Sequence, residues 1–322
     1  MMREGYEQRP ASYGDLQAIT DVIIATEILE RGESNATTEE LVSSWQRPRF
    51  NLDQDAWVVI TKTDPQLVVG YEEVWNRKDF QNFMGDGYVH PAHRNVGIGT
   101  ALIRRMESRV REQIQLASTD SRIVIQNGVS GADTAGISLH ENEGYQPVRY
   151  FWRMEITLDQ EPIPAEPISG IDIILFKPGL DGPHAYQAVT EAFHDHWNYI
   201  QPPYEEWSRY LQNESFNPKA SYLAMAGAEP VGAVLCETQG SEGWVRTLAV
   251  RRNWRRMGVG LFLLRTAFSE FYRMGMAKAG LSVDAENLTG ATRLYEKAGM
   301  HVAHQYIVFE KEIQSAIIST DC

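Results

Sequence analysis

A turn rich in arginine and glycine, residues 255–260, carries the clearest chemical signal in the sequence. It follows an apolar run at 244–249, which predicts a buried strand, and it precedes an apolar run at 261–268 with helical spacing. Its two glycines allow a close backbone approach, and its two arginines add charged donors suited to a pyrophosphate. Because the first N–H groups of a helix have no partner inside that helix, the turn predicts a phosphate-binding site.

Two familiar phosphate-binding motifs are excluded by residue type. A Walker loop requires Lys followed by Ser or Thr after its second glycine, and the turn lacks both. A dinucleotide-binding loop requires a third glycine at the position where Leu263 stands. The pattern that remains is Arg-x-x-Gly-x-Gly between a strand and a helix, which a glycine-rich turn without function would also match.

The same pattern occurs a second time, at residues 94–99, again after a strand-like run and before an amphipathic segment. Other landmarks recur in the same order in both halves, including a strand with an aromatic start, a strand holding a glycine and a closing corner of glycine and a hydrophobic residue. The period is too long for a solenoid. The sequence therefore predicts a duplicated domain.

The pattern Arg-x-x-Gly-x-Gly resembles motif A of the GNAT-type N-acetyltransferases, in which this loop binds the pyrophosphate of acetyl-CoA. The resemblance implies acetyl-CoA as a co-substrate and a coenzyme-binding segment in each half. In the C-terminal half the residues are Leu248, Ala249, Val250, Arg255, Arg256, Met257, Gly258, Val259, Gly260 and Asn287. In the N-terminal half they are Tyr88, Val89, Arg94, Asn95, Val96, Gly97, Ile98 and Gly99.

A second segment strengthens the resemblance, because Asn287 is followed by Leu294-Tyr295 and then by a corner at Gly299. This spacing resembles motif B of the same family, and the tandem arrangement is similar to mycothiol synthase and its relatives. The fold implied is α/β with mixed sheets: two GNAT-like domains in tandem, each a central mixed sheet flanked by helices. In such a domain the fourth and fifth strands splay apart at a bulge, and the pantetheine arm lies between them.

The resemblance also implies direct attack of an amine on the thioester, which needs a base for the ammonium and an acid for the thiolate. Tyr295 is the expected acid; spacing alone would favour an aromatic side chain buried for packing, and the resemblance to motif B reverses that preference. Glu242 is the candidate base, near the start of the central strand and acting through water. A solvated hairpin residue is the competing interpretation of Glu242, and Glu237 is the substitute candidate.

The N-terminal half departs from the family pattern where chemistry would occur. His140 stands at the position that matches Tyr295, and Ala132 stands at the position that matches Asn287. Histidine can act as an acid, so activity is not excluded. We expect the N-terminal half to bind coenzyme and to be catalytically degenerate, and the C-terminal half to be catalytic.

Length and composition agree with two soluble domains. The chain of 322 residues suggests residues 1–158 as one domain, a stiff proline-rich linker at 159–170, and residues 171–322 as the other, with the first eight residues loose. A formal net charge of −13 argues against nucleic acid or an anionic membrane as partner. Two distant cysteines, Cys236 and Cys322, and the lack of a long apolar window predict a reduced, cytoplasmic protein.

The histidine pairs His90/His93 and His194/His196 lack a carboxylate or cysteine at metal-ligand spacing, so we expect no metal. Two functions stay open: an acetyltransferase acting on the primary amine of a small molecule, and a non-catalytic acyl-CoA sensor or scaffold. Tyr295 and Asn287, which match the family's motif B in one half, favour the enzyme. The sequence does not indicate which amine, which acyl length or which oligomeric state applies.

Overall fold

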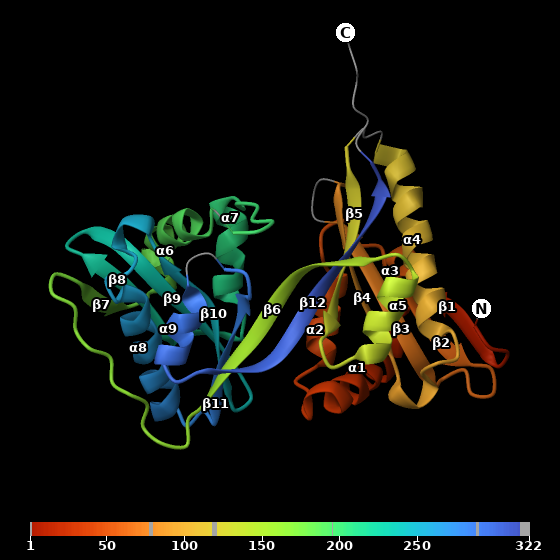
Figure 1. Ribbon diagram of the computed structural model, residues 1–322, viewed down its shortest axis with the longest axis horizontal. Helices are drawn as coiled ribbons and strands as arrows, with labels where there is room; N and C mark the ends of the chain where they lie inside the picture. Colours follow the sequence, from red (N-terminus) through yellow and green to blue (C-terminus); the bar gives the residue numbers. More distant parts are fainter. Residues whose placement is uncertain (1, 77–79, 118–120, 195, 288–289, 316–322) are drawn as a thin grey trace, which may run out of the picture. The chain divides into compact units, whose positions relative to one another are not determined.

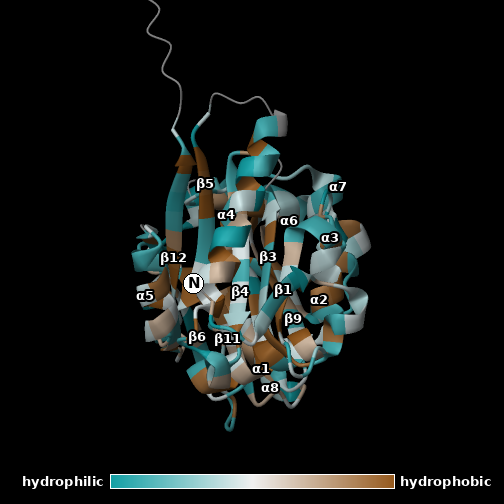
Figure 2. Ribbon diagram, turned by 90° about the vertical axis from the view of Figure 1, so that its right-hand side faces the viewer, coloured by the Kyte–Doolittle hydropathy of each residue, from teal (hydrophilic) through white to brown (hydrophobic). Residues whose placement is uncertain are grey.

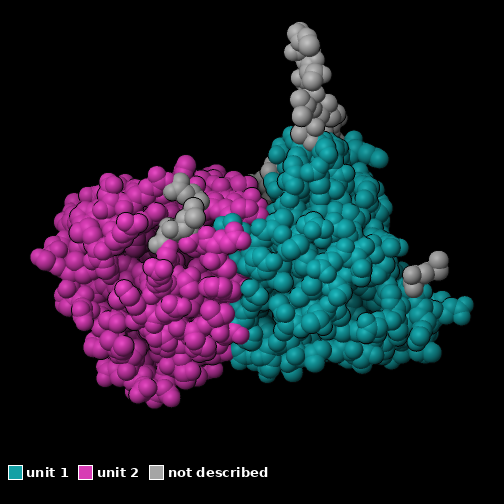
Figure 3. All heavy atoms as spheres, viewed as in Figure 1, with its two compact units in different colours: residues 1–150, 304–322 teal, residues 151–303 magenta. Residues whose placement is uncertain are grey.

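The computed structural model describes residues 2–76, 80–117, 121–194, 196–287 and 290–315. The chain forms two compact units, coloured separately in Figure 3. Residues 1–150 and 304–322 make up the N-terminal unit, and residues 151–303 make up the C-terminal unit. Each unit is described here by itself.

The N-terminal unit is built on a mixed sheet with the order β1-β2-β3-β4-β5-β12 (Figure 1). Neighbouring strands pair antiparallel except β4 and β5, which are parallel. The strands are β1 Tyr6–Pro10, β2 Ala56–Thr61, β3 Val68–Asn76, β4 Asn82–Val89, β5 Ile123–Ser130 and β12 His301–Gln314.

Helices cover both faces of this sheet. One face packs against α4, through Ile98, Leu102 and Met106, and the other packs against α1 and α2, through Ile19 and Trp45. In Figure 2, α4 carries both hydrophilic and hydrophobic segments, as expected of a helix with one face on a core. The helices are α1 Leu16–Arg31, α2 Thr38–Trp45, α3 Leu52–Asp55, α4 Ile98–Ala117 and α5 Thr134–Asn142, with short 3-10 turns at Tyr13–Asp15 and Pro91–His93.

The C-terminal unit repeats this plan with the strand order β6-β11-β10-β9-β8-β7, in which β10 and β11 are the parallel pair. Helix α8 packs on one face through Leu263, Leu264 and Phe268, and α6 packs on the other through Ala185 and Val189. The strands are β6 Gln146–Thr157, β7 Asp172–Leu175, β8 Phe216–Ala226, β9 Glu229–Gln239, β10 Glu242–Val250 and β11 Lys278–Asp284. The helices are α6 Pro178–Phe193, α7 Tyr204–Trp207, α8 Val259–Arg273 and α9 Ala291–Lys297, with 3-10 turns at Ser208–Gln212 and Arg252–Trp254.

The closing strands are exchanged between the two halves of the sequence (Figure 1). Strand β6 pairs with β11, from Phe151↔Asp284 to Thr157↔Lys278, and Met154 lies in the core of the C-terminal unit. Strand β12 pairs with β5, and its residues Ile307 and Phe309 lie in the core of the N-terminal unit. An alternating pattern predicts that a strand forms but not which neighbour it pairs with, so sequence reasoning assigned each closing strand to its own half.

The fold class predicted from the sequence, tandem mixed α/β domains, is confirmed. Two local expectations were wrong. The first residues are not loose, because β1 pairs with β2 from Tyr6↔Thr61 to Pro10↔Trp57. Helix α6 begins at Pro178, before the expected start at residue 184, because proline is tolerated in the first turn of a helix. Pro183 therefore lies inside the helix and does not mark its boundary. Within the described part of the chain, no helix is long and apolar enough to traverse a bilayer.

The assignment of β12 to the core of the N-terminal unit can be tested by mutation. Phe309 is 1% exposed on β12, so Phe309→Ala should destabilise the N-terminal unit by about 3–5 kcal/mol, the usual cost of a deleted core phenylalanine. Val302→Ala on the same strand, where the side chain is 44% exposed, is the control. Hydrogen exchange should accelerate in peptides of α4 and β5. Faster exchange in β10 and β11 instead would contradict the assignment of β12 to the N-terminal unit.

Candidate active site

The turn after β10 has the backbone of a phosphate-binding loop. Arg256 and Gly258 adopt left-handed φ values of 64° and 89°, and Gly258 is the N-cap of α8. The chain therefore reverses sharply between the strand and the helix, and the free N–H groups of the first turn of α8 face outward from its N-terminus. A side chain at position 258 would be strained, because residues other than glycine rarely adopt this conformation.

The turn after β4 has the same backbone. Asn95 has φ of 63° and Gly97 has φ of 86°, at the positions that match Arg256 and Gly258. Helix α4 follows at Ile98, as α8 follows at Val259. The duplication seen in the sequence thus extends to the conformation of both turns.

The second glycine of each turn serves helix packing. A Cβ built on Gly260 would lie 2.8 Å from Leu294 Cδ1 of α9, and one built on Gly99 would lie 2.6 Å from Leu139 Cδ2 of α5. Both distances are shorter than atoms normally approach. These glycines let α9 and α5, the helices that carry Tyr295 and His140, approach the first turns of α8 and α4.

The first arginine of each turn holds protein groups. Arg255 donates from Nε to the carbonyl oxygen of Val250 at 3.2 Å and from Nη2 to that of Ala192 at 3.0 Å. Arg94 bridges Asp133 at 2.9 Å and Glu30 at 3.0 Å. The sequence predicts that these guanidinium groups bind a pyrophosphate. In the structure they donate hydrogen bonds to carbonyl and carboxylate oxygens of the protein. Arg256 is exposed and remains the better placed cation.

The parallel strands of the C-terminal unit part beside the turn. Strand β10 pairs with β11 from Glu242↔Lys278 to Trp244↔Gly280 and no further. Arg246 forms a bulge between the pairs that Val245 and Thr247 make with β9. Residues 248–250 stay paired with β9 on one side and have no β11 pair on the other. The β11-facing edge of these three residues is thus left without a strand partner.

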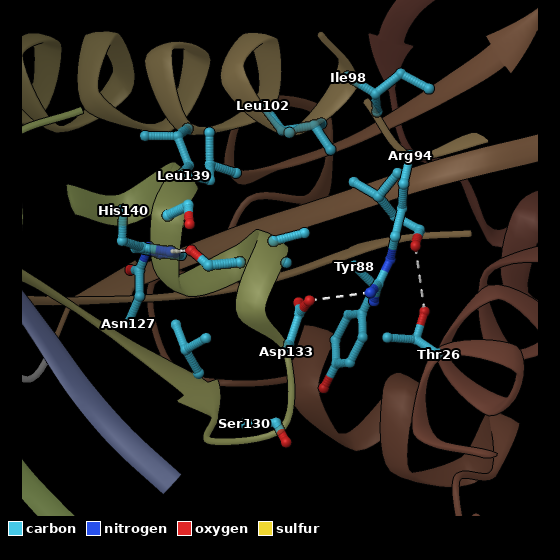
Figure 4. A pocket seen from close by; sticks show the side chains of 18 of the residues that line it. Thr26, Tyr88, Arg94, Ile98, Leu102, Asn127, Ser130, Asp133, Leu139 and His140 are labelled. Atoms are coloured by element: carbon cyan, nitrogen blue, oxygen red, sulfur yellow. Dashed lines mark hydrogen bonds and ion pairs between the residues drawn. The ribbon is translucent and has the colours of Figure 1, made fainter. Parts of the chain in front are cut away.

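The strands of the N-terminal unit part in the same way, although without a bulge in β4. Strand β4 pairs with β5 from Asn82↔Val124 to Gly85↔Asn127, and residues 86–89 continue without a β5 pair. A cleft of about 640 Å³ occupies this region (Figure 4). It is lined by residues of α1, β3, β4, α4, β5 and α5, by the phosphate turn and by Tyr306 of β12.

Carboxylates line the cleft at the point where β4 and β5 part. Glu72 is buried, its Oε1 has no hydrogen-bond partner among the described residues, and burial followed by repulsion from Asp86 raises its pKa well above the usual range. Burial, and then the charge of Glu73, raises the pKa of Asp86 to about 7. Tyr88 donates its hydroxyl proton to Asp86 Oδ2 at 3.2 Å. Perturbed carboxyl groups in a cleft are typical of functional sites.

The C-terminal unit has no carboxylate at the equivalent positions. The two sheets align through the strand pairs Gly70↔Val89 and Gly232↔Val250, just before each turn. Counted from these pairs, the C-terminal unit has Val234 in place of Glu72, Leu235 in place of Glu73, Thr247 in place of Asp86 and Ala249 in place of Tyr88.

His140 is a buried neutral group between β5 and α5 (Figure 4). Its Nδ1 lies 2.8 Å from the carbonyl oxygen of Gly136 and must donate there, so Nε2 accepts from Asn127 Nδ2 at 2.9 Å. Burial lowers the pKa of His140, which keeps the ring neutral. Both ring nitrogens are thus occupied, and Asn127 Oδ1 is left buried without a partner among the described residues.

Comparison with known proteins gives the family. The model of the acetyltransferase (GNAT) family matches residues 25–125 and 186–300, one stretch in each half and together more than half of the chain. The chain belongs to the GNAT acetyltransferase family. It is a GNAT-type acetyltransferase, and the family uses acetyl-CoA as donor.

Several relatives resemble this acetyltransferase over most of its length. A GCN5-related N-acetyltransferase of Sphaerobacter thermophilus is 34% identical, with 98% of each chain covered and a TM-score of 0.85. A mycothiol acetyltransferase of Catenulispora acidiphila is 26% identical over 257 residues, which are 77% of this chain and 79% of the relative. A tandem GNAT protein from the clavulanic acid biosynthesis pathway shares the fold, at 16% identity, with a TM-score of 0.72 and coverage of 97% and 100%.

Tyr295 lies on α9 with its side chain 8% exposed, among the core residues of the C-terminal unit. Burial raises the pKa of Tyr295 to about 12, which leaves the hydroxyl protonated at neutral pH and makes it a weaker acid than an exposed tyrosine. Asn287 lies in the loop between β11 and α9, where its N–H donates to the carbonyl oxygen of Asp284 at 3.1 Å.

Glu242 lies at the paired end of β10, before the strands part, and its carboxylate accepts a hydrogen bond from Arg153. The same arginine also contacts Glu155 at 2.5 Å. Glu237, the substitute base, pairs with Arg246 at 3.2 Å. Glu242 and Glu237 would each have to lose the contact with an arginine before accepting a proton from an amine. Neither carboxylate is therefore free to act as a base in this arrangement.

Sequence reasoning missed Glu72 and Asp86. A signal was present: two adjacent acids, Glu72-Glu73, stand inside a strand-like run, and Asp86 stands between two glycines of the next. Acids are uncommon in buried strands unless they are paired or functional. The structure adds that Cys236 is buried, whereas Cys322 lies outside the described residues. No group of three or more His, Cys, Asp or Glu side chains in the described ranges could hold a metal ion.

The turn geometry predicts that valine at either left-handed glycine blocks coenzyme binding at that turn alone. Gly97→Val gives an N-blocked protein and Gly258→Val a C-blocked protein, because φ of 86° or 89° is strained for a β-branched residue. Calorimetric titration with acetyl-CoA should detect two sites in the parent and one in each variant. A parent with a single site that survives both substitutions would contradict this.

The arginine contacts predict different effects for two neighbours in the N-blocked protein. Arg256→Glu should weaken acetyl-CoA binding on the order of 10-fold with little change in Tm, because an exposed cation becomes an anion. Arg255→Glu should lower both affinity and Tm, because its guanidinium holds two carbonyl oxygens. Titration and thermal unfolding separate the two. Equal effects on Tm would refute the anchoring role of Arg255.

Proposed function

We propose that this protein transfers the acetyl group of acetyl-CoA to the primary amine of a small molecule, by direct attack within a ternary complex. The observation that carries the proposal is the juxtaposition of a left-handed phosphate turn with two parallel strands that part beside it. This pair of features occurs in both units. It supplies N–H donors for a pyrophosphate and an open backbone edge within one continuous surface.

The open edge suits the pantetheine arm of the coenzyme. Amide groups of the arm can pair with the backbone of residues 248–250 as an added strand would, since that edge has no β11 pair. A backbone N–H at the same edge can stabilise the oxyanion that forms when the thioester carbonyl is attacked. The pyrophosphate would then lie at the N-terminus of α8, next to the exposed Arg256.

The reaction requires two proton transfers. A lysine-like amine has a pKa of about 10 and must lose a proton before it attacks, and the thiolate that leaves must gain one. Tyr295 is the proposed acid in the C-terminal unit, supported by the close packing of α9 on the first turn of α8 at the Gly260–Leu294 contact. Glu242 remains the sequence-based candidate for the base there, and it would first have to release Arg153.

The acceptor is proposed to be a small molecule. Curated relatives that carry the name mycothiol acetyltransferase support a small-molecule acceptor over a protein substrate. The family membership favours an enzyme over the alternative of a non-catalytic acyl-CoA sensor. Thiol release from acetyl-CoA with a panel of amines tests the proposal, and tight coenzyme binding without turnover of any amine would overturn it.

The role of Tyr295 is tested in the N-blocked protein, so that turnover reports on the C-terminal unit alone. Tyr295→Phe should lower turnover on the order of 10²-fold at saturating acetyl-CoA and leave coenzyme affinity nearly unchanged, because the ring still packs while the hydroxyl is lost. Tyr272→Phe, a tyrosine 36% exposed on α8, is the matched control. Equal turnover in the two variants would remove Tyr295 from the mechanism.

A further inference from the structure

We infer that the inner end of the cleft in the N-terminal unit recognises a polar acyl group. Its preferred ligand is the CoA thioester of a short acid that carries a hydroxyl group on its second carbon, and Glu72 and Asn127 select that hydroxyl. The inference rests on the proposed function, because it takes from it the place of the coenzyme on the turn at residues 94–99. It goes beyond that function by assigning an acyl preference to this half of the chain.

Glu72 and Asn127 direct their side chains to the same face of the sheet, the one covered by α4. A Cβ built on Gly85 would lie 2.5 Å from Asn127 Oδ1 and 3.2 Å from Glu72 Oε1, and it would clash with Met106 of α4. These distances bring the two oxygens close enough together for one hydroxyl group to contact both. The missing side chains of Gly85 and Gly87 leave the room that the carboxyl group of Glu72 occupies.

The free acceptor of Asn127 is fixed in place by His140. Nδ1 of His140 donates to the carbonyl oxygen of Gly136 at 2.8 Å, so Nε2 of the neutral ring accepts a hydrogen bond. The amide NH₂ of Asn127 must therefore face the ring, at 2.9 Å, and Oδ1 must point away from it. Asn127 is 5% exposed, and its Oδ1 has no partner among the described residues. A buried acceptor without a donor is costly, so this oxygen requires a donor from a bound group.

Glu72 is the second, independent sign of a ligand. Its side chain is 3% exposed, and its Oε1 also has no partner in the described part of the chain. Burial, and then the charges of Asp86 and Glu73, raise the pKa of Glu72 well above the usual range, so the carboxyl group is protonated at neutral pH. A protonated carboxyl group offers one donor as well as an acceptor.

A hydroxyl group complements this pair of side chains. It can accept the proton of Glu72 and donate its own to Asn127 Oδ1, so both buried groups gain a partner. A methyl group at the same place would leave both without one. A carboxylate would have no proton to give to Asn127. The donor and acceptor set therefore favours a hydroxylated acyl group over an alkyl or an anionic one.

The two residues lie where the acyl end of the coenzyme would lie. They line the same cleft as the turn at residues 94–99, and Figure 4 shows Asn127 and Arg94 well apart in it. The free edge of β4, residues 86–89, runs between that turn and the last rung, Gly85↔Asn127. An arm that follows this edge from a pyrophosphate on the turn ends at the rung, beside Glu72, which pairs with Gly87.

The C-terminal unit lacks the polar partner. Val234 stands in place of Glu72 there, fully buried in the apolar core of that unit. A hydroxyl group buried against valine gains no hydrogen bond in return for its lost water. The acyl preference should therefore be a property of the N-terminal unit alone, and the N-blocked protein is an internal control.

The test compares glycolyl-CoA with propionyl-CoA, whose acyl groups have the same number of non-hydrogen atoms and differ by a hydroxyl for a methyl. Calorimetric titration of the full-length C-blocked protein should give a Kd for glycolyl-CoA lower on the order of 10-fold, because neutral hydrogen bonds form that the methyl cannot make. The N-blocked protein should not share this preference.

Two substitutions of one residue separate recognition from structure. Glu72→Gln keeps a neutral donor and acceptor and should retain the preference for glycolyl-CoA, whereas Glu72→Leu should abolish it. Glu141→Leu, at an exposed acid of α5, should leave both affinities unchanged. A purely structural Glu72 would instead alter the affinities for both thioesters by the same factor.

The comparison of the two thioesters in the C-blocked protein does not depend on the folding of either Glu72 variant. If Gly258→Val itself prevents folding, Arg256→Glu supplies a second background, because it places an anion at the exposed cation of the C-terminal turn. The tighter site of that protein then reports on the N-terminal cleft.

The outcomes separate this inference from the proposed function. Equal affinity of the C-blocked protein for the two thioesters, as a bound water between the two oxygens would produce, overturns the inference. A preference that survives Glu72→Leu overturns it as well. No binding of any CoA thioester to the C-blocked protein, with turnover in the N-blocked one, overturns the inference and leaves the proposed function intact. Preference for glycolyl-CoA in a protein whose parent acetylates no amine overturns the proposed function alone.

Discussion

Parallel pairing that stops part-way along the strands is the constraint on which the rest of each unit depends. β4 and β5 part after Gly85, and β10 and β11 part after Trp244. Beyond these residues one edge of a central strand lacks a neighbour, although buried backbone groups need partners. In each unit the turn that follows this edge leads into a helix, α4 or α8, against which α5 or α9 packs. A coenzyme that carries amide groups can satisfy this edge.

The two units keep this backbone and differ in what they place beside it. The N-terminal unit supplies buried acids and a neutral histidine locked by Asn127. The C-terminal unit supplies an apolar strand face, Thr247 and a protonated tyrosine. Backbone geometry therefore determines where a thioester can lie, whereas a handful of side chains determine which proton transfers each unit supports.

Patterns local in sequence were the ones that could be predicted. The two turns between strand and helix and the helix Thr134–Asn142 follow from spacing and residue type within a short window. Contacts that depend on distant residues could not be predicted. The sequence indicates Arg255 as a phosphate ligand, whereas in the structure its guanidinium donates to the carbonyl oxygen of Ala192. The pairing of Glu242 with Arg153 is of the same kind, because β6 had been assigned to the other half.

The exchanged strands bear on how the chain can be made. The core of the N-terminal unit includes Ile307 and Phe309, which are synthesised after nearly every other described residue. A ribosome adds about 5–20 residues per second, so the edge of β5 that pairs with β12 stays unpaired for many seconds during synthesis. An unpaired edge is a template for wrong partners. Division of the gene at the proline-rich segment would accordingly yield two polypeptides that each lack a strand, and that regain it only by finding each other.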